Sequence, residues 1–575
     1  MNELFARLFI LIIINYKYTK EIFTMALRNR GSDAVHWYMQ EISSRVVAES
    51  GIASDRHHLG KLILQGFKDD PNFIATIDGA TDEKETFGSS LKRSIQCATA
   101  FRKIGLKHGD VIVIMAPNHI HITIPMYAAL YVGVGVSGID MTLGVNELRD
   151  TFKFNEPKII FCQKEKEQDV ELALQALQHN AQIVTFDKGG KNMCFSDFLD
   201  KYGSDASIEN FQASDFDPNE TIALLVATSG TTGLPKSAAV SHKNFAVCVP
   251  YMWTMYDKFP TPTRLPIVFS PIQWYSALFK FVFSPILRHT RLQSSAPMTQ
   301  EHAYDIINKY RPTYAMSGPN MLTTFFKIGE REKCDFTCFE VLLAGGSAVH
   351  PSLFDDVKAA SPNTQLKVIY GMSELSGIAF DFDATQPTSL GRMLWNFNHK
   401  LVDPETLKEV TEPNKPGELW VKGPGVFKGY YNNPEVTSQM LMEGGWLRTG
   451  DIMRRDENWN FYFVDRMKLL LKYRNHHISP LEIESVIAKH PGVFEVTVTG
   501  IPHREHGDLP IAFVVLHEGY NTSEQEIKDL VKNELTDSKQ LRGGVVFLKS
   551  MPLTSTSKVD RQKLAAIARK KEVII

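Results

Sequence analysis

Short apolar runs alternate with helical segments from about residue 84 onward, and this alternation constrains the fold more than any other feature of the chain. Helical spacing predicts helices over residues 91–104, 122–131 and 146–154, and the apolar runs between them predict strands over 111–115, 133–139 and 158–161. Gly105 is the expected C-terminal end of the first helix. Strands that alternate with helices predict a parallel sheet with helices on both faces, whose ligands bind beyond the carboxyl ends of the strands.

A polar, glycine-containing stretch, residues 228–237, follows a predicted buried parallel strand over 222–227 and precedes a short predicted strand over 238–240. Glycine lets backbone N–H groups approach an anion, while hydroxyls and a lysine add donors and charge suited to phosphate oxygens. The stretch therefore predicts a polyphosphate cradle, formed by Ser229, Gly230, Thr231, Thr232, Gly233 and Lys236.

Two other interpretations of this stretch are open. A P-loop has nearly the same spacing, but its second glycine is replaced here by Pro235, which has no N–H to donate. The simpler alternative is a solvated turn between two strands, which is the usual meaning of a Ser/Thr/Gly cluster.

Further motifs follow along the chain. They are Gly345-Gly346 after an apolar run, Tyr370-Gly371-Met372-Ser373-Glu374, Gly445-Trp446-Leu447-Arg448-Thr449-Gly450-Asp451, Asp465-Arg466-Met467-Lys468, and Lys558 in the segment 552–561. Together with residues 228–237, they resemble the signature of the adenylate-forming superfamily, in the branch of acyl-CoA synthetases, coumarate–CoA ligases and beetle luciferases. Only Ser237 departs from the superfamily's phosphate loop, where a glycine is usual.

The resemblance, which extends from about Thr86 to the C-terminus, implies an α/β fold. It consists of a large N-terminal domain of stacked α/β sheets and a smaller, hinged C-terminal α+β domain. We expect an adenylation domain over residues 25–466 and a mobile domain over 467–575, after an apolar extension over 1–24. A chain of 575 residues is too long for one ordinary core, which also favours at least two domains.

The resemblance implies ATP, Mg²⁺ and coenzyme A as cofactors, and a carboxylic acid as substrate. Tyr370 can stack on adenine, beside Gly345, Gly346 and Gly371, and Ser373 can donate to the α-phosphate. Asp451 and Arg466 are the expected ribose and phosphate contacts, and Glu374 is the expected Mg²⁺ ligand. The expected catalytic residues are Lys558, Glu374 and Thr231.

The expected reaction joins a fatty or aryl acid to AMP and then transfers the acyl group to coenzyme A. By resemblance, the hinge lies at Lys468, and the thiol-transfer loop begins at Lys472. Asn475 and Ser557 replace glycines of the pattern, which puts thioester formation in more doubt than adenylation. A luciferase-like monooxygenase is the first alternative, although Trp274 replaces its pocket histidine and Cys248 replaces a basic residue. An impaired acyl- or nucleotide-binding protein is the second, and a P-loop NTPase is a weaker third.

Composition excludes several classes of partner. A net charge of −2 gives no electrostatic case for nucleic acid or an anionic membrane. The apolar run 8–14 is too short to span a bilayer, so we expect no integral membrane span. Six cysteines without regular spacing indicate a reducing, intracellular compartment, cytoplasmic or peroxisomal, although no Ser-Lys-Leu signal ends the chain. The oligomeric state, the acid and the role of residues 1–24 stay open.

Overall fold

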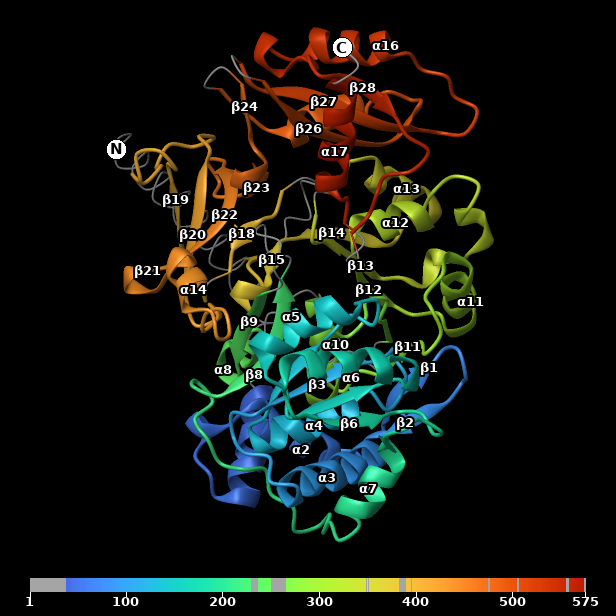
Figure 1. Ribbon diagram of the computed structural model, residues 1–575, viewed down its shortest axis with the longest axis vertical. Helices are drawn as coiled ribbons and strands as arrows, with labels where there is room; N and C mark the ends of the chain where they lie inside the picture. Colours follow the sequence, from blue (N-terminus) through green and yellow to red (C-terminus); the bar gives the residue numbers. More distant parts are fainter. Residues whose placement is uncertain are drawn as a thin grey trace, which may run out of the picture.

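Two large sheets form the main part of the molecule (Figure 1). The computed structural model describes residues 38–228, 236–249, 265–347, 349, 351–381, 389–394, 396–473, 476–503, 506–554 and 558–572. The first sheet has the strand order β14 (Gln365–Ile369), β13 (Val341–Gly345), β12 (Tyr314–Ser317), β10 (Pro266–Ile267), β11 (Arg291–Gln293), β1 (Ile74–Asp78) and β2 (Lys84–Thr86). The second has the order β7 (Met193–Cys194), β6 (Gln182–Thr185), β5 (Ile159–Cys162), β3 (Val111–Met115), β4 (Gly135–Gly138), β8 (Ile222–Thr228) and β9 (Lys236–Ser241).

Helices fill the space between these sheets and cover their outer faces. One hydrophobic core joins the two sheets to α2 (Leu59–Asp69), α3 (Phe87–Lys103), α4 (Thr123–Val132) and α10 (Tyr275–Leu287). The outer face of the first sheet packs on α11 (Gln300–Tyr310), α12 (Pro319–Phe325) and α13 (Ser352–Ala360), and that of the second sheet on α5 (Val145–Asn155) and α6 (Glu167–Leu177). All residues of α4 are buried, as its uniformly apolar sequence requires. The stacked α/β arrangement predicted for this part is confirmed.

Local sequence signals explain the predicted helices and strands. Thr86 caps α3 by accepting a hydrogen bond from the Ser89 backbone N–H, and Gly105 takes the left-handed conformation, with φ of 85°, just after the helix. The predictions of helices around 91–104, 122–131 and 146–154 are confirmed by α3, α4 and α5. The strand over 222–227 is parallel only toward β4, because β9 turns back antiparallel on its other side.

A third sheet carries the later motifs, and a fourth sheet begins a separate unit. The third contains β19 (Asn398–Val402), β20 (Gly417–Lys422), β22 (Trp446–Arg455), β21 (Leu441–Met442) and β23 (Phe461–Arg466). The fourth contains β25 (His476–Ile478), β24 (Leu471–Tyr473), β27 (Gly507–Leu516), β26 (Val493–His503) and β28 (Gly544–Phe547). Helices α15 (Pro480–Ile487) and α16 (Glu524–Glu534) share a core with one face of the fourth sheet, and α17 (Arg561–Glu572) with the other. This smaller α+β unit lies above α12 and α13 in Figure 1.

The connection between the third and fourth sheets is fixed by one carboxylate. Asp465 is 4% exposed, and its Oδ2 accepts a hydrogen bond of 2.6 Å from the hydroxyl of Ser479, the cap of α15. Its Oδ1 accepts a bond of 2.7 Å from the backbone N–H of Arg466. The predicted change of domain at residue 466 therefore coincides with the end of β23, where one side chain joins both units; the domain limits themselves stay a prediction.

Candidate active site

The predicted motifs lie at strand ends that face one region between the sheets. β8 ends at Thr228 and β9 begins at Lys236, so the predicted cradle residues Ser229, Gly230, Thr231, Thr232 and Gly233 lie outside the described residues. β13 ends at Gly345 and β14 ends just before Tyr370. These neighbouring parallel strands end at the same edge of the first sheet. The structure therefore describes only the two ends of the predicted phosphate cradle, Thr228 and Lys236.

Tyr370, Asp451 and Arg466 form one hydrogen-bonded and ionic group. The Tyr370 hydroxyl donates to Asp451 Oδ2 at 2.6 Å, and Arg466 Nε lies 3.2 Å from Asp451 Oδ1. Burial raises the pKa of Asp451, while Arg466 and the Tyr370 hydroxyl oppose that rise. The pKa of Arg466 is raised above its usual value, chiefly by Asp451. The group offers a carboxylate and a guanidinium side by side, as recognition of a sugar hydroxyl next to a phosphate requires.

Glu374 lies in a second, buried group. It is 6% exposed, and its Oε1 accepts a hydrogen bond of 2.6 Å from the Tyr430 hydroxyl. Burial raises the pKa of Glu374, and the hydrogen bond from Tyr430 opposes that rise. Lys236 Nζ lies 5.6 Å from the centre of the Tyr430 ring. Burial and the charge of Lys468 lower the pKa of Lys236, so the predicted hinge lysine faces the same region.

The donor set fits one Mg²⁺ ion shared with a nucleotide. Within the described part of the chain, no three His, Cys, Asp or Glu side chains gather as a metal site. Magnesium commonly takes one or two protein carboxylates, with phosphate and water oxygens completing its octahedron. The Glu374 carboxylate, with lysines nearby for phosphate oxygens, matches that pattern.

The glycines at and just beyond the ends of β13 and β14 are required for two different reasons. A Cβ on Gly345 would lie 2.5 Å from Ile369 Cγ1 and 2.7 Å from the Ile369 carbonyl oxygen. A Cβ on Gly371 would lie 2.3 Å from the carbonyl oxygen of Gly377. Gly346 has open space around it but a φ of 92°, which disfavours other residues. The sequence interpretation assigned Gly345 to the space for adenine; in the structure, strand packing alone already demands a glycine there.

Lys558 reaches this region from the far end of the chain. Its loop is closed by a hydrogen bond of 2.7 Å from the Thr554 N–H to the Lys558 carbonyl and by pairing of Leu553 with Val559. Its Nζ lies 5.6 Å from the centre of the Trp274 ring. Burial and the charge of Arg466 lower the pKa of Lys558, whereas Glu374 and Asp451 oppose that shift. The predicted tail lysine therefore lies within electrostatic reach of both carboxylates.

Lys472, the predicted start of the thiol-transfer loop, takes no part in this group. Lys472 is exposed on β24, and its backbone N–H donates to Asp508 within the fourth sheet at 2.9 Å. The departures Asn475 and Ser557 lie outside the described residues. Ser373 begins a short helical turn that presents Glu374. The sequence interpretation missed Tyr430, because nothing near it in the sequence marks it as the partner of a carboxylate 56 positions away.

Ser237, the departure from the phosphate-loop pattern, is built into the core. Its φ is not positive, so the usual glycine is not required by the backbone here. The Ser237 hydroxyl donates to Asn155 Oδ1 at 2.8 Å, and Asn155 Nδ2 donates to Ser137 Oγ at 2.9 Å. All three side chains are at most 6% exposed. This chain of bonds ties the start of β9 to α5 and β4.

Replacing Ser237 by alanine should therefore lower stability. The Asn155 oxygen would lose its donor inside the core, which costs about 1–3 kcal/mol. We expect the unfolding midpoint of the large domain to fall by a few degrees in calorimetry. Ser438→Ala, which removes an exposed hydroxyl bonded only within α14 (Pro434–Met440), is the matched control. Equal unfolding midpoints for Ser237→Ala and Ser438→Ala would show that the buried hydrogen bond between Ser237 and Asn155 does not stabilise the fold.

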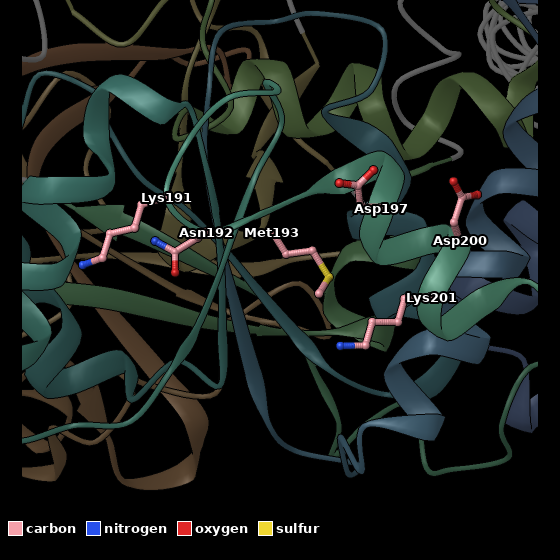
Figure 2. A pocket seen from close by; sticks show the side chains of 6 residues that line it. All are labelled: Lys191, Asn192, Met193, Asp197, Asp200 and Lys201. Atoms are coloured by element: carbon pink, nitrogen blue, oxygen red, sulfur yellow. The ribbon is translucent and has the colours of Figure 1, made fainter.

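A separate surface hollow of about 710 Å³ lies beside β7 and α7 (Phe195–Gly203) and contains none of the predicted site residues. Figure 2 shows the residues that line it: Lys191, Asn192 and Met193 on one side, and Asp197, Asp200 and Lys201 on the other. Lys191 is paired with Glu171 at 2.8 Å. The hollow is therefore not part of the candidate site.

The fold and the gathered residues define a nucleotide-dependent enzyme built from a large α/β part and a small α+β part that contributes a lysine. Residues 65–431 match the family model described as AMP-binding enzyme, and residues 482–558 match the AMP-binding enzyme C-terminal domain. The chain belongs to this AMP-binding, adenylate-forming family, which confirms the predicted resemblance.

The relatives of this chain include proteins named as luciferases and proteins named as CoA ligases. The chain is 30% identical over 526 residues to luciferin 4-monooxygenase of Photuris pensylvanica, covering 88% of this chain and 94% of that one. It is 28% identical to a probable CoA ligase of Humulus lupulus, covering 87% and 91%. Among solved structures, an ATP-bound chimera of RpMatB and BxBclM superposes with a TM-score of 0.79 at 25% identity, covering 89% of this chain and 99% of that one. No helix in the described ranges is long and apolar enough to cross a membrane.

Proposed function

We propose that this protein is an ATP- and Mg²⁺-dependent acid–CoA ligase. It activates a fatty or aryl carboxylic acid as an acyl-adenylate and then forms the acyl-CoA thioester. The observation that carries the proposal is the position of Lys558: its Nζ lies 5.6 Å from the centre of the Trp274 ring, and the charges of Glu374 and Asp451 act on its pKa. A lysine ammonium at this position would stabilise the negative charge that develops when a carboxylate attacks the α-phosphate of ATP.

The first half-reaction is a substitution at phosphorus. A carboxylate oxygen bonds to the α-phosphorus of ATP, the bond to the bridging oxygen breaks, and pyrophosphate leaves. The acid is already ionised at neutral pH, so no general base is needed. The barrier arises from bringing two anions together, and fixed positive groups lower it. Bound Mg²⁺ would neutralise the leaving phosphates.

Each residue then has a role. Lys558 stabilises the charge shared between the carboxylate and the α-phosphate. Lys236 and the loop 229–235, including Thr231, hold the β- and γ-phosphates, and Glu374 holds the metal. Tyr370 and Asp451 orient the nucleoside, and Arg466 contacts the ribose or the α-phosphate. Ser373 donates to the α-phosphate.

The second half-reaction passes the acyl group to a thiol. The thiolate sulfur of coenzyme A attacks the acyl carbonyl, and AMP leaves with the electrons of the broken C–O bond of the acyl-phosphate anhydride. We assign this step to a different orientation of residues 467–575 about Lys468, in which the exposed Lys472 lies near the thiol channel. Lys472 supports this assignment through its exposure on β24.

A luciferase-like monooxygenase is the second candidate, favoured by the 30% identity to luciferin 4-monooxygenase. Two side chains, Trp274 and Cys248, disfavour luciferase activity. Trp274, the counterpart of the luciferase pocket histidine, contacts Lys558 by its ring. Cys248 stands where luciferases have a basic residue; it is 4% exposed, and burial raises its pKa to about 12, which keeps it uncharged.

Incubation with ATP, Mg²⁺ and a panel of fatty and aromatic acids tests the proposal. We expect acid-dependent release of AMP and pyrophosphate, and a thioester when coenzyme A is added. ADP and phosphate as products would point to an NTPase. Light from firefly luciferin and oxygen, without thioester from any acid, would favour the monooxygenase. Nucleotide binding without turnover on any acid would indicate a binding protein.

A further inference from the structure

The small unit touches the large part at a second place, on the outer side of the first sheet. Lys327, which follows α12, lies with its Nζ 4.7 Å from the centre of the Phe494 ring on β26. The Phe494 ring meets the His517 ring edge to face, with centres 5.4 Å apart. In Figure 1, α12 and α13 lie below the fourth sheet, to the right of α17.

Each partner in this contact is held by its own unit. The Lys327 carbonyl accepts hydrogen bonds from the backbone N–H groups of Glu330 and Arg331, which fixes the turn after α12. On the other side, the backbone N–H of His517 donates to the Gly492 carbonyl at 3.0 Å, holding His517 beside the start of β26. The contact therefore joins two rigid surfaces.

Charge also favours this arrangement. Asp356, on α13, accepts a hydrogen bond of 3.2 Å from Arg331 and faces His517 across the same boundary. Burial and the charge of Lys327 lower the pKa of His517, with Asp356 opposing, so His517 is neutral at pH 7. A neutral imidazole leaves Lys327 as the cation at the Phe494 ring, where a half-buried ammonium is attracted by the π face.

We infer that Lys327 and Phe494, supported by His517 and Asp356, form a latch that positions the small unit with Lys558 inserted into the active site. The inference rests on the proposed function. The latch residues touch no reacting group; they act through Lys558. The latch stabilises the orientation for adenylation and not the one for thiol transfer, so its loss should slow the first half-reaction selectively.

Lys327→Gln and Phe494→Leu test the latch. Each removes one side of the cation–π contact and keeps most of the packing. We expect acid-dependent ATP–pyrophosphate exchange to fall by about 3- to 10-fold, while thioester formation from supplied acyl-adenylate stays unchanged or rises. Lys327→Arg, which keeps a cation over the ring, should restore exchange. Lys309→Gln removes a lysine that lies 5.2 Å from the Tyr310 ring within the large part, and it should change neither step.

A distance measurement separates this inference from the proposed function. Spin labels at the exposed positions Lys358 and Glu518, in a Cys338→Ser background, report the separation of the two parts; the other cysteines are buried. We expect a longer-distance population in Lys327→Gln and Phe494→Leu only. Were the wild type inactive on every acid, the proposed function would fail and this measurement would decide the latch alone. In an active enzyme, unchanged exchange in both variants would overturn the latch, whatever the distances.

Discussion

Replacing Lys558 by alanine should lower acyl-adenylate formation by about 100- to 1,000-fold, the cost of removing one fixed charge from a developing anion. The lysine Nζ lies 5.6 Å from the centre of the Trp274 ring, and the charges of Glu374 and Asp451 act on it. Single-turnover formation of acyl-adenylate measures the effect. Transfer from supplied acyl-adenylate to coenzyme A should remain largely intact.

Two further variants make this prediction specific. Lys549→Ala removes an exposed lysine from the same part of the chain and should leave both half-reactions unchanged. Lys558→Arg keeps the charge but not the point-like ammonium, and should recover part of the rate. Equal loss of both half-reactions in Lys558→Ala would contradict the assigned role.

The pH dependence follows from the same lysine. Burial and Arg466 lower the pKa of Lys558, and the protonated form is the active one. The adenylation rate should therefore fall as pH rises through this lowered pKa, at a lower pH than for an ordinary lysine. In Lys558→Arg that high-pH fall should disappear, because a guanidinium does not titrate in this range.

Glu374→Gln should also reduce adenylation by about 100-fold or more, because a neutral amide is a much weaker ligand for Mg²⁺ than a carboxylate. The amide oxygen can still accept the hydrogen bond from the Tyr430 hydroxyl, so the fold around the site should persist. Adenylation measured across a range of Mg²⁺ concentrations should show a raised Mg²⁺ requirement along with the lower rate.

Tyr430→Phe is the control for this second prediction. It removes the hydroxyl bonded to Glu374 and keeps the ring beside Lys236. Since the carboxylate remains, we expect a loss of about tenfold at most, equivalent to one hydrogen bond. A Glu374→Gln variant with normal rate and normal Mg²⁺ requirement would remove Glu374 from the metal site.

Much of the fold could be predicted because helix and strand periodicity is a local property. The helices α3, α4 and α5 and the strands β3 and β5 follow directly from the spacing of apolar residues. The pairing of β8 was predicted less well. Its apolar run indicated a parallel strand, and β8 does pair parallel with β4, but β9 pairs with it antiparallel on the other side.

The sequence predicted which residues belong to the candidate site, but it predicted only part of how they are arranged in space. Motifs identified Glu374, Asp451 and Lys558, and the structure brings them together. It also adds Tyr430 as the partner of Glu374 and Asn155 as the partner of Ser237, across 56 and 82 positions. No local sequence pattern predicts such pairs, because contacts between residues far apart in the sequence depend on how the sheets pack together.

The sequence by itself predicted the chemistry that the chain can offer: a phosphate-binding loop, an acidic residue for a metal, and a lysine near the tail. These are encoded in short segments whose backbone geometry is local. Only the tertiary structure decided that Lys558 lies against Trp274 and that Lys327 meets Phe494 across the boundary between the two units. The physical reason is that such contacts depend on the packing of whole sheets and helices, which is set by all their buried side chains together.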